Sequence, residues 1–97
     1  MNEEELENRL YAVLSSVKAA HPKMYFENVA EFIKYGEWKL AVEVLCENLL
    51  EYKLFFPKET YSDLVSAAEC LNVDKRYWKD LLVEENREAN TNQSRSE

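Results

Sequence analysis

The sequence predicts an all-α protein, a small single-domain bundle of about five helices with a disordered C-terminal tail. Three observations support this prediction. Apolar residues recur at helical spacing in five segments. One Gly and two Pro among 97 residues are too few for the corners of an all-β protein. A hydrophobic content of 46% is enough for a core. The length fits one domain, which we place at residues 1–85, and residues 86–97 contain only one apolar residue and form the expected tail.

The first helix is predicted over residues 3–19. Glutamates gather at its start, where the helix dipole favours negative charge. His21 precedes Pro22, and the residue before a proline is pushed out of the α region, so the helix ends there. The predicted inner stripe comprises Leu6, Leu10, Val13, Leu14 and Val17.

The second helix is predicted from about residue 22 or 23 to Tyr35, and it ends at Gly36. This residue is the only glycine of the chain and can adopt the left-handed conformation that terminates a helix. The third helix should begin at Trp38 and end near Lys53. The predicted inner stripe of the second helix comprises Phe26, Val29, Ala30 and Ile33.

A fourth helix should open at residues 57–60, after the proline-bounded segment 54–57. Residues 72–74 form a turn, and Asp74 is a natural N-cap for a fifth helix that we predict to run through about Glu85. No strand pattern competes with these helices. The apolar positions expected to face inward are Tyr61, Leu64, Val65, Ala68 and Leu71 in the fourth helix and Tyr77, Trp78, Leu81 and Leu82 in the fifth.

The third helix is apolar on most sides but keeps one row of acids. At about 100° per residue, Glu43, Glu47 and Glu51 stack on one line at spacing i, i+4, i+8. Leu40 and Val44 flank that line on one side and Leu50 on the other. The opposite face, which should be buried, comprises Trp38, Ala41, Val42, Leu45, Leu49 and Tyr52. The acid row is either a solvated outer face or a recognition face for a basic partner.

The charge distribution narrows the possible partners. The net charge is −7, which argues against nucleic-acid or anionic-membrane binding, since both require a positive surface. Residues 24–52 hold six acids against two bases, so the acidity lies mainly on the second and third helices. No apolar run approaches the roughly 18–20 residues that span a bilayer. Since the N-terminus is acidic and lacks the basic region of a secretory signal, we expect a cytoplasmic protein.

Catalytic patterns are missing from the sequence. His21 is the only histidine, and nothing matches a P-loop, GxGxxG, GxSxG or HExxH motif. We therefore expect no enzymatic activity, no catalytic residue, no cofactor and no metal site. Cys46 and Cys70 are 24 positions apart, each inside a helical pattern, and are expected to be buried free thiols.

The segment from Tyr35-Gly36-Glu37 through Leu40–Leu49 to Glu51-Tyr52 resembles the central signature of the MafI-family immunity proteins. In that family, a G-E-x-x-x-A-x-E-x-L-C-[DE]-x-L-x-E-type helix precedes a proline-containing loop and two short helices. The matching continuation here is 57–61, then 71–74 and 77–78, so the resemblance covers about residues 26–82. Glu43 matches the strongest glutamate of the family signature, and Glu47 matches its Asp/Glu position.

This resemblance implies an immunity protein that binds and neutralises a cognate bacterial toxin domain of a contact-dependent growth inhibition system, often an RNase of the EndoU type. The expected partner is the C-terminal domain of the toxin, bound 1:1 by a protein that is monomeric when free. Because a nuclease must be basic to hold its substrate, the acid row is complementary in charge. The candidate partner-binding residues are Glu31, Leu40, Glu43, Val44, Glu47 and Glu51. Two alternatives remain open: a helical adaptor that binds a helix or peptide, and a regulatory subunit that self-associates through Leu40, Val44 and Leu50.

Overall fold

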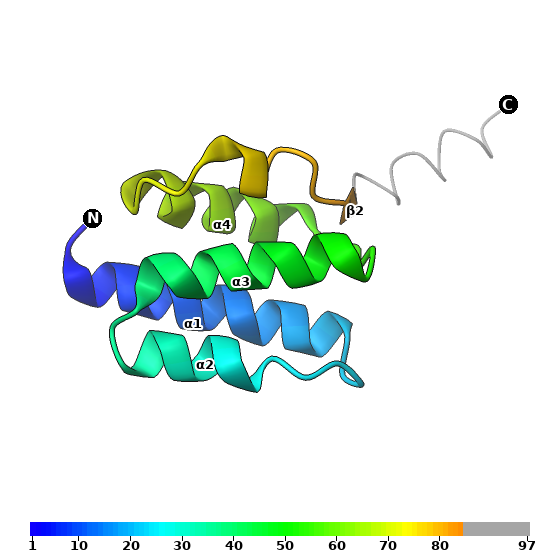
Figure 1. Cartoon of the computed structure of the whole chain (residues 1–97), viewed down its shortest axis with the longest axis horizontal. Coiled ribbons are helices and arrows are strands. Elements are labelled where there is room, and N and C mark those ends of the chain that lie inside the picture. Colours follow the sequence, from blue (N-terminus) through cyan, green and yellow to red (C-terminus); the bar gives the residue numbers. More distant parts are fainter. Residues whose placement is uncertain (85–97) are drawn as a thin grey trace, which may run out of the picture.

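The structure, a computed structural model, describes residues 1–84, which form a four-helix bundle with a short C-terminal segment packed on it (Figure 1). The predicted all-α bundle is confirmed, whereas the predicted tail at 86–97 lies outside the described residues. The α-helices are α1 (Glu3–Ala20), α2 (Glu27–Lys34), α3 (Trp38–Glu51) and α4 (Lys58–Cys70). The remaining elements are the 3₁₀ helix η1 (Lys75–Tyr77) and the two-residue strands β1 (Phe56–Pro57) and β2 (Val83–Glu84).

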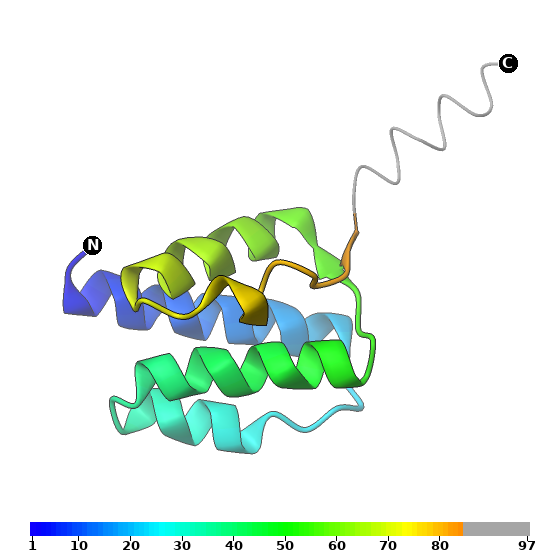
Figure 2. The same cartoon turned by 45° about the horizontal axis from the view of Figure 1, so that its top comes forward.

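The four helices pack in a ring. Helix α1 contacts α2 and α4, and α3 contacts the same two neighbours from the other side (Figures 1 and 2). Figure 2 shows the segment that contains η1 lying between α3 and α4 in this view, and η1 contacts α3. Helix α3 is therefore flanked by α2 on one side and by α4 and η1 on the other.

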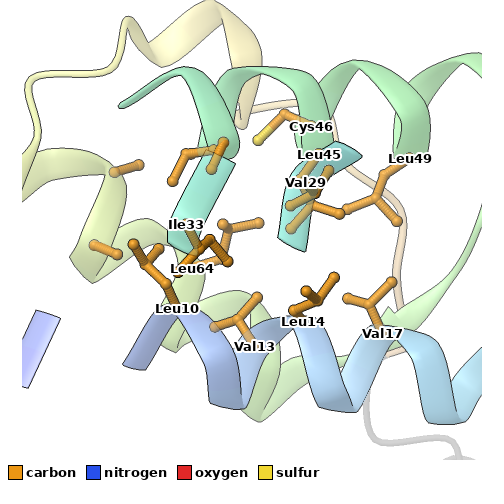
Figure 3. Close-up of a cluster of buried hydrophobic side chains, with 14 of the residues drawn as sticks. Leu10, Val13, Leu14, Val17, Val29, Ile33, Leu45, Cys46, Leu49 and Leu64 are labelled. Atoms are coloured by element: carbon orange, nitrogen blue, oxygen red, sulfur yellow. The ribbon is translucent and has the colours of Figure 1, made fainter. Parts of the chain in front are cut away.

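The core lies where the inner faces of the helices converge. Figure 3 shows side chains of α1 directed towards side chains of the other helices. All five predicted inner residues of α1 are buried, since Leu6, Leu10, Val13, Leu14 and Val17 are each no more than 5% exposed. The residues they meet are Val29 and Ile33 of α2, Leu45, Cys46 and Leu49 of α3, and Leu64 of α4.

Local hydrogen bonds explain why α1 begins at Glu3. The Asn2 side chain accepts a hydrogen bond from the Glu5 backbone N–H at 2.8 Å, and the Glu5 carboxylate accepts one from the Asn2 N–H at 3.0 Å. This reciprocal pair is a capping box, which satisfies backbone donors that the first turn leaves without partners.

Two positions beyond the last residue of α2, α3 and α4, the backbone adopts a positive φ, at Gly36 (78°), Lys53 (52°) and Asn72 (59°). The backbone N–H that follows each of these residues donates to a carbonyl five positions earlier. At the end of α2, for example, Glu37 donates to Phe32 at 2.8 Å. These Schellman-type ends turn the chain sharply towards the next element.

The second helix begins later than predicted. Residues 21–26 form a turn in which the Met24 N–H donates to the His21 carbonyl at 3.0 Å, and α2 starts only at Glu27. The His21 ring is hydrogen-bonded through Nε2 to the Phe55 carbonyl, which ties this turn to the loop after α3. Phe26 is buried and fixes the entry to α2.

The predicted fifth helix over 74–85 is wrong. Asp74 does cap as expected, because its side chain accepts from the Arg76 N–H at 2.9 Å, but the helical turn ends at Tyr77. The Tyr61 hydroxyl donates to the Trp78 carbonyl at 3.1 Å, so tertiary contacts hold this backbone away from helix continuation.

The expectation that no strand forms is also wrong, although only for four residues. Strands β1 and β2 pair in parallel, with Phe56 opposite Val83 and Pro57 opposite Glu84. The Phe56 N–H donates to the Leu82 carbonyl at 3.3 Å. This pairing holds the C-terminal segment against the start of α4.

Candidate functional site

Helix α3 is held rigidly on its inner side. Five of its residues are almost fully buried: Ala41, Val42, Leu45, Cys46 and Leu49. Its first turn is tied to α2, because the Trp38 indole N–H donates to the Ile33 carbonyl at 3.0 Å. The outward side of α3 is therefore presented on a fixed support.

The outward side of α3 carries Glu47 and Glu51, both exposed, and Leu40, which is 40% exposed. We call these three residues the α3 ridge. They lie opposite the buried residues, as the helical periodicity predicts. A carboxylate pair beside an exposed leucine can form charge-assisted hydrogen bonds and apolar contacts with a partner surface.

Glu43 and Val44 are less available than the predicted acid row implies. Both are half-buried, and Val44 packs against the core. Helix α3 contacts η1, and Glu43 adds to the charges that raise the pKa of Arg76, after the larger contributions of Tyr77 and Asp74. The negative charge of Glu43 therefore acts in part on Arg76 in η1.

Glu31 is exposed on α2, on the side opposite the buried Val29 and Ile33. The structure thus places it on the outward side of a neighbouring helix and not within the α3 row. Of the six residues predicted to bind a partner, Leu40, Glu47 and Glu51 share one outward surface, Glu43 and Val44 are half-buried at its flanks, and Glu31 is on the adjacent helix.

Exposed aromatic residues are the part of the surface that the sequence patterns missed. Tyr52 was predicted to be buried, but α3 ends one residue earlier and Tyr52 is 54% exposed. Tyr25 is 81% exposed, and Phe55 is also largely exposed. All three lie at or beyond helix ends, where helical periodicity does not predict which side chains are buried. The only sequence signal for their exposure was that they cluster in short connecting segments.

The depressions on the described surface are shallow and have no catalytic constellation. A pocket of about 290 Å³ lies between α2 and α3 and is lined by Lys23, Met24, Tyr25, Asn28, Asn48 and Tyr52. Within residues 1–84, no group of three His, Cys, Asp or Glu side chains is arranged to hold a metal ion. In the same part of the chain, no helix combines the length and apolar character needed to cross a membrane.

Burial raises the pKa of the Cys46 thiol to about 12, with smaller contributions from the carboxylates of Glu47 and Glu43. Since a thiol in the unfolded chain ionises near about pH 8.5, the unfolded state loses this proton first. The associated stability is complete below about pH 8.5 and is lost progressively as the pH rises towards 12.

Urea denaturation between pH 8 and 10 measures this loss of stability. The Cys46→Ala variant is the control, because it lacks the thiol and should show a correspondingly weaker decline with pH. Identical pH dependence in the two proteins would contradict the buried, protonated thiol.

The chain matches no protein-family model, and neither a curated protein nor a solved structure matches it significantly.

Proposed function

We propose that this protein is an immunity protein of the MafI type, which neutralises a cognate bacterial toxin domain by binding it in the cytoplasm of the producing cell. The favoured toxin is a nuclease, in particular an RNase of the EndoU type. In this proposal the protein is monomeric when free, binds its partner 1:1, and contributes no catalytic residue, cofactor or metal. The resemblance of residues 26–82 to the family signature supports the class of protein.

The α3 ridge is the observation that carries the proposed binding mode. Glu47 and Glu51 are exposed on a helix whose opposite side is buried, so they lose little further conformational freedom of the backbone on binding. Their substitution also leaves the core untouched. The structure further favours Glu47 and Glu51 over Glu43, because Glu43 is half-buried beside η1.

Charge complementarity favours a nuclease as the partner. A nuclease binds a polyanion and is therefore basic at its active site. Six acids against two bases in residues 24–52 produce the opposite field on α2 and α3. Such complementarity increases the association rate and selects among partners.

The Glu47→Lys substitution tests this proposal. We expect unchanged helical circular dichroism and melting, and a dissociation constant for the toxin domain that rises about tenfold or more. The partner in this assay is the purified C-terminal domain of the cognate toxin. Raising the salt from 0.1 to 1 M should slow association, because the Debye length falls from about 10 to about 3 Å.

Glu69→Lys is the matched control, since Glu69 is an exposed glutamate on α4 and its replacement changes the net charge equally. We expect it to bind the toxin domain almost as tightly as the unmodified protein. If charge reversal at Glu47 and Glu51 together left affinity and protection of cells unchanged, the α3 ridge would not be the interface.

The two alternative functions make different use of the same surface. Self-association would require Leu40, Val44 and Leu50, but Val44 and Leu50 are half-buried against the core and offer limited area. Size-exclusion chromatography with light scattering separates a monomer from such an oligomer. An adaptor that binds a helix through apolar contact would tolerate reversal of the acids and would depend on Leu40.

A further inference from the structure

The pocket between α2 and α3 lies beside the α3 ridge. It is lined by Lys23, Met24, Tyr25, Asn28, Asn48 and Tyr52, and we call it the tyrosine pocket. Asn48 directly follows Glu47 of the ridge, and Tyr52 directly follows Glu51. Its volume of about 290 Å³ is at the lower limit of roughly 300–1,000 Å³ for small-molecule sites, so it suits a protruding side chain and not a cofactor.

The walls of the tyrosine pocket combine two aromatic side chains with two amides. Tyr25 comes from the turn before α2 and Tyr52 from the end of α3, and both are more than half exposed. Asn28 and Asn48 supply carbonyl oxygens, of which the Asn28 oxygen also accepts from the Val29 N–H at 2.9 Å. Aromatic faces and amide oxygens are the groups that bind a planar cation with several N–H donors.

Other tyrosines of the chain already pair with cations. The Lys34 ammonium lies 5.6 Å from the Tyr35 ring centroid, and the Arg76 guanidinium carbon lies 5.1 Å from that of Tyr77. Within residues 1–84, neither Tyr25 nor Tyr52 has a cation of the chain over its ring. Their faces are therefore open to a cation from a partner.

Three exposed carboxylates are neighbours of the lining residues along the chain. Glu27 precedes Asn28 on α2, while Glu47 and Glu51 precede Asn48 and Tyr52 on α3. The carbonyl end of α3, which favours positive charge, and the start of α2, which favours negative charge, both lie at the pocket, so the two helix dipoles offset each other. Lys23 is the one basic side chain in the lining. Its long stem allows the ammonium to extend into solvent while the stem remains in the wall.

We propose that the tyrosine pocket receives an arginine side chain of a protein partner, stacked on Tyr25 and Tyr52 and hydrogen-bonded to the Asn28 and Asn48 amide oxygens. The identity of that partner rests on the proposed function, since the pocket extends the α3 ridge towards the basic surface of the toxin. Arginine is favoured over lysine because its planar guanidinium both stacks and donates several hydrogen bonds in fixed directions.

Titration of the full chain with N-acetyl-arginine amide tests the pocket directly, with the side-chain amide signals of Asn28 and Asn48 followed by NMR. We expect weak, saturable shifts confined to the tyrosine pocket. N-acetyl-lysine amide should shift the same signals less, and N-acetyl-glutamine amide should leave them unchanged. If N-acetyl-glutamate amide bound instead, the pocket would be an anion site formed by Lys23 and the start of α2, and the proposal would be overturned.

Variants locate the binding to the two tyrosines. Removing both rings in Tyr25→Ala/Tyr52→Ala should weaken N-acetyl-arginine amide binding about tenfold. Tyr35→Ala is the matched control, an exposed tyrosine at the other end of α2. Lys23→Gln should strengthen arginine binding by removing a like charge. Equal binding by the double variant and the unmodified chain, or loss of arginine binding in Lys23→Gln, would overturn the proposal.

The toxin assay separates this proposal from the proposed function. If Glu47→Lys weakens toxin binding but Tyr25→Ala/Tyr52→Ala does not, the ridge is the interface and the pocket is not part of it. If the arginine probe binds the pocket but no toxin domain binds the chain, the immunity function is wrong and the arginine-binding pocket remains. Failure of the arginine probe overturns the pocket whatever the toxin assay shows.

Discussion

Replacing Phe56 by alanine is expected to lower the free energy of unfolding by about 3–5 kcal/mol. Phe56 has no exposed surface, and its ring packs near Tyr61 with centroids 6.2 Å apart. Its backbone pairs with Val83, so the cavity would form where α4 begins and the C-terminal segment docks. Since domains of this size are stable by only about 5–15 kcal/mol, the loss is a large fraction of the total.

Phe55→Ala provides a matched control, because it removes the same side chain from the adjacent position. Phe55 is 48% exposed, and its carbonyl, which binds the His21 ring, is retained in the variant. We expect its substitution to cost less than about 1 kcal/mol. Chemical denaturation of both variants measures the difference, and equal losses would contradict the burial of Phe56. Trp38→Ala should fall between the two because Trp38 is only half-buried.

The two cysteines are expected to react with a thiol reagent at rates that differ by about a thousandfold or more. Cys46 is fully buried and its pKa is about 12, so it reacts only when the protein opens, and unfolded fractions are about 10⁻³–10⁻⁶. Cys70 is exposed at the end of α4 and should react quickly. The expectation that both thiols are buried was therefore wrong for Cys70, which lies about 120° around α4 from the buried Leu64.

Labelling at pH 8 followed by mass spectrometry measures both rates. The Cys70→Ser variant should lose the fast phase and retain the slow one, and denaturant should make Cys46 fast. Two fast phases in the native protein would contradict the packing of α3, and a slow Cys70 would contradict the exposed end of α4.

Much of the candidate site follows from local periodicity. Glu47 and Glu51 lie opposite Ala41, Val42 and Leu45 because the helix repeats every 3.6 residues, and the structure places them outward as that repeat requires. The partial burial of Glu43 and Val44 at the flanks of this row does not follow from helical periodicity. Glu43 is half-buried, and α3 is in contact with η1, which lies about thirty positions further along the chain.

The tyrosine pocket could not be predicted either, because it also depends on contacts between segments that are distant in the sequence. It joins Tyr25 and Asn28 to Asn48 and Tyr52, which come from opposite ends of two helices. Their proximity depends on the short turn at Gly36, which reverses the chain, and on the packing of α2 against α3. The sequence pattern of a single helix specifies neither the crossing angle nor the distance at which the two helices pack.

By itself, the sequence determined the helical class, the limits of α1, the five buried residues of α1 and the outward position of Glu47 and Glu51. Each of these follows from interactions within about one or two turns, such as the capping box of Asn2 and Glu5. Only tertiary contacts determine that residues 78–84 are not helical. The Tyr61 hydroxyl donates to the Trp78 carbonyl, and the Phe56 N–H donates to the Leu82 carbonyl. Hydrogen bonds and burial between distant segments outweighed a local helical preference that is worth only fractions of a kcal/mol per residue, roughly 0.7 or less.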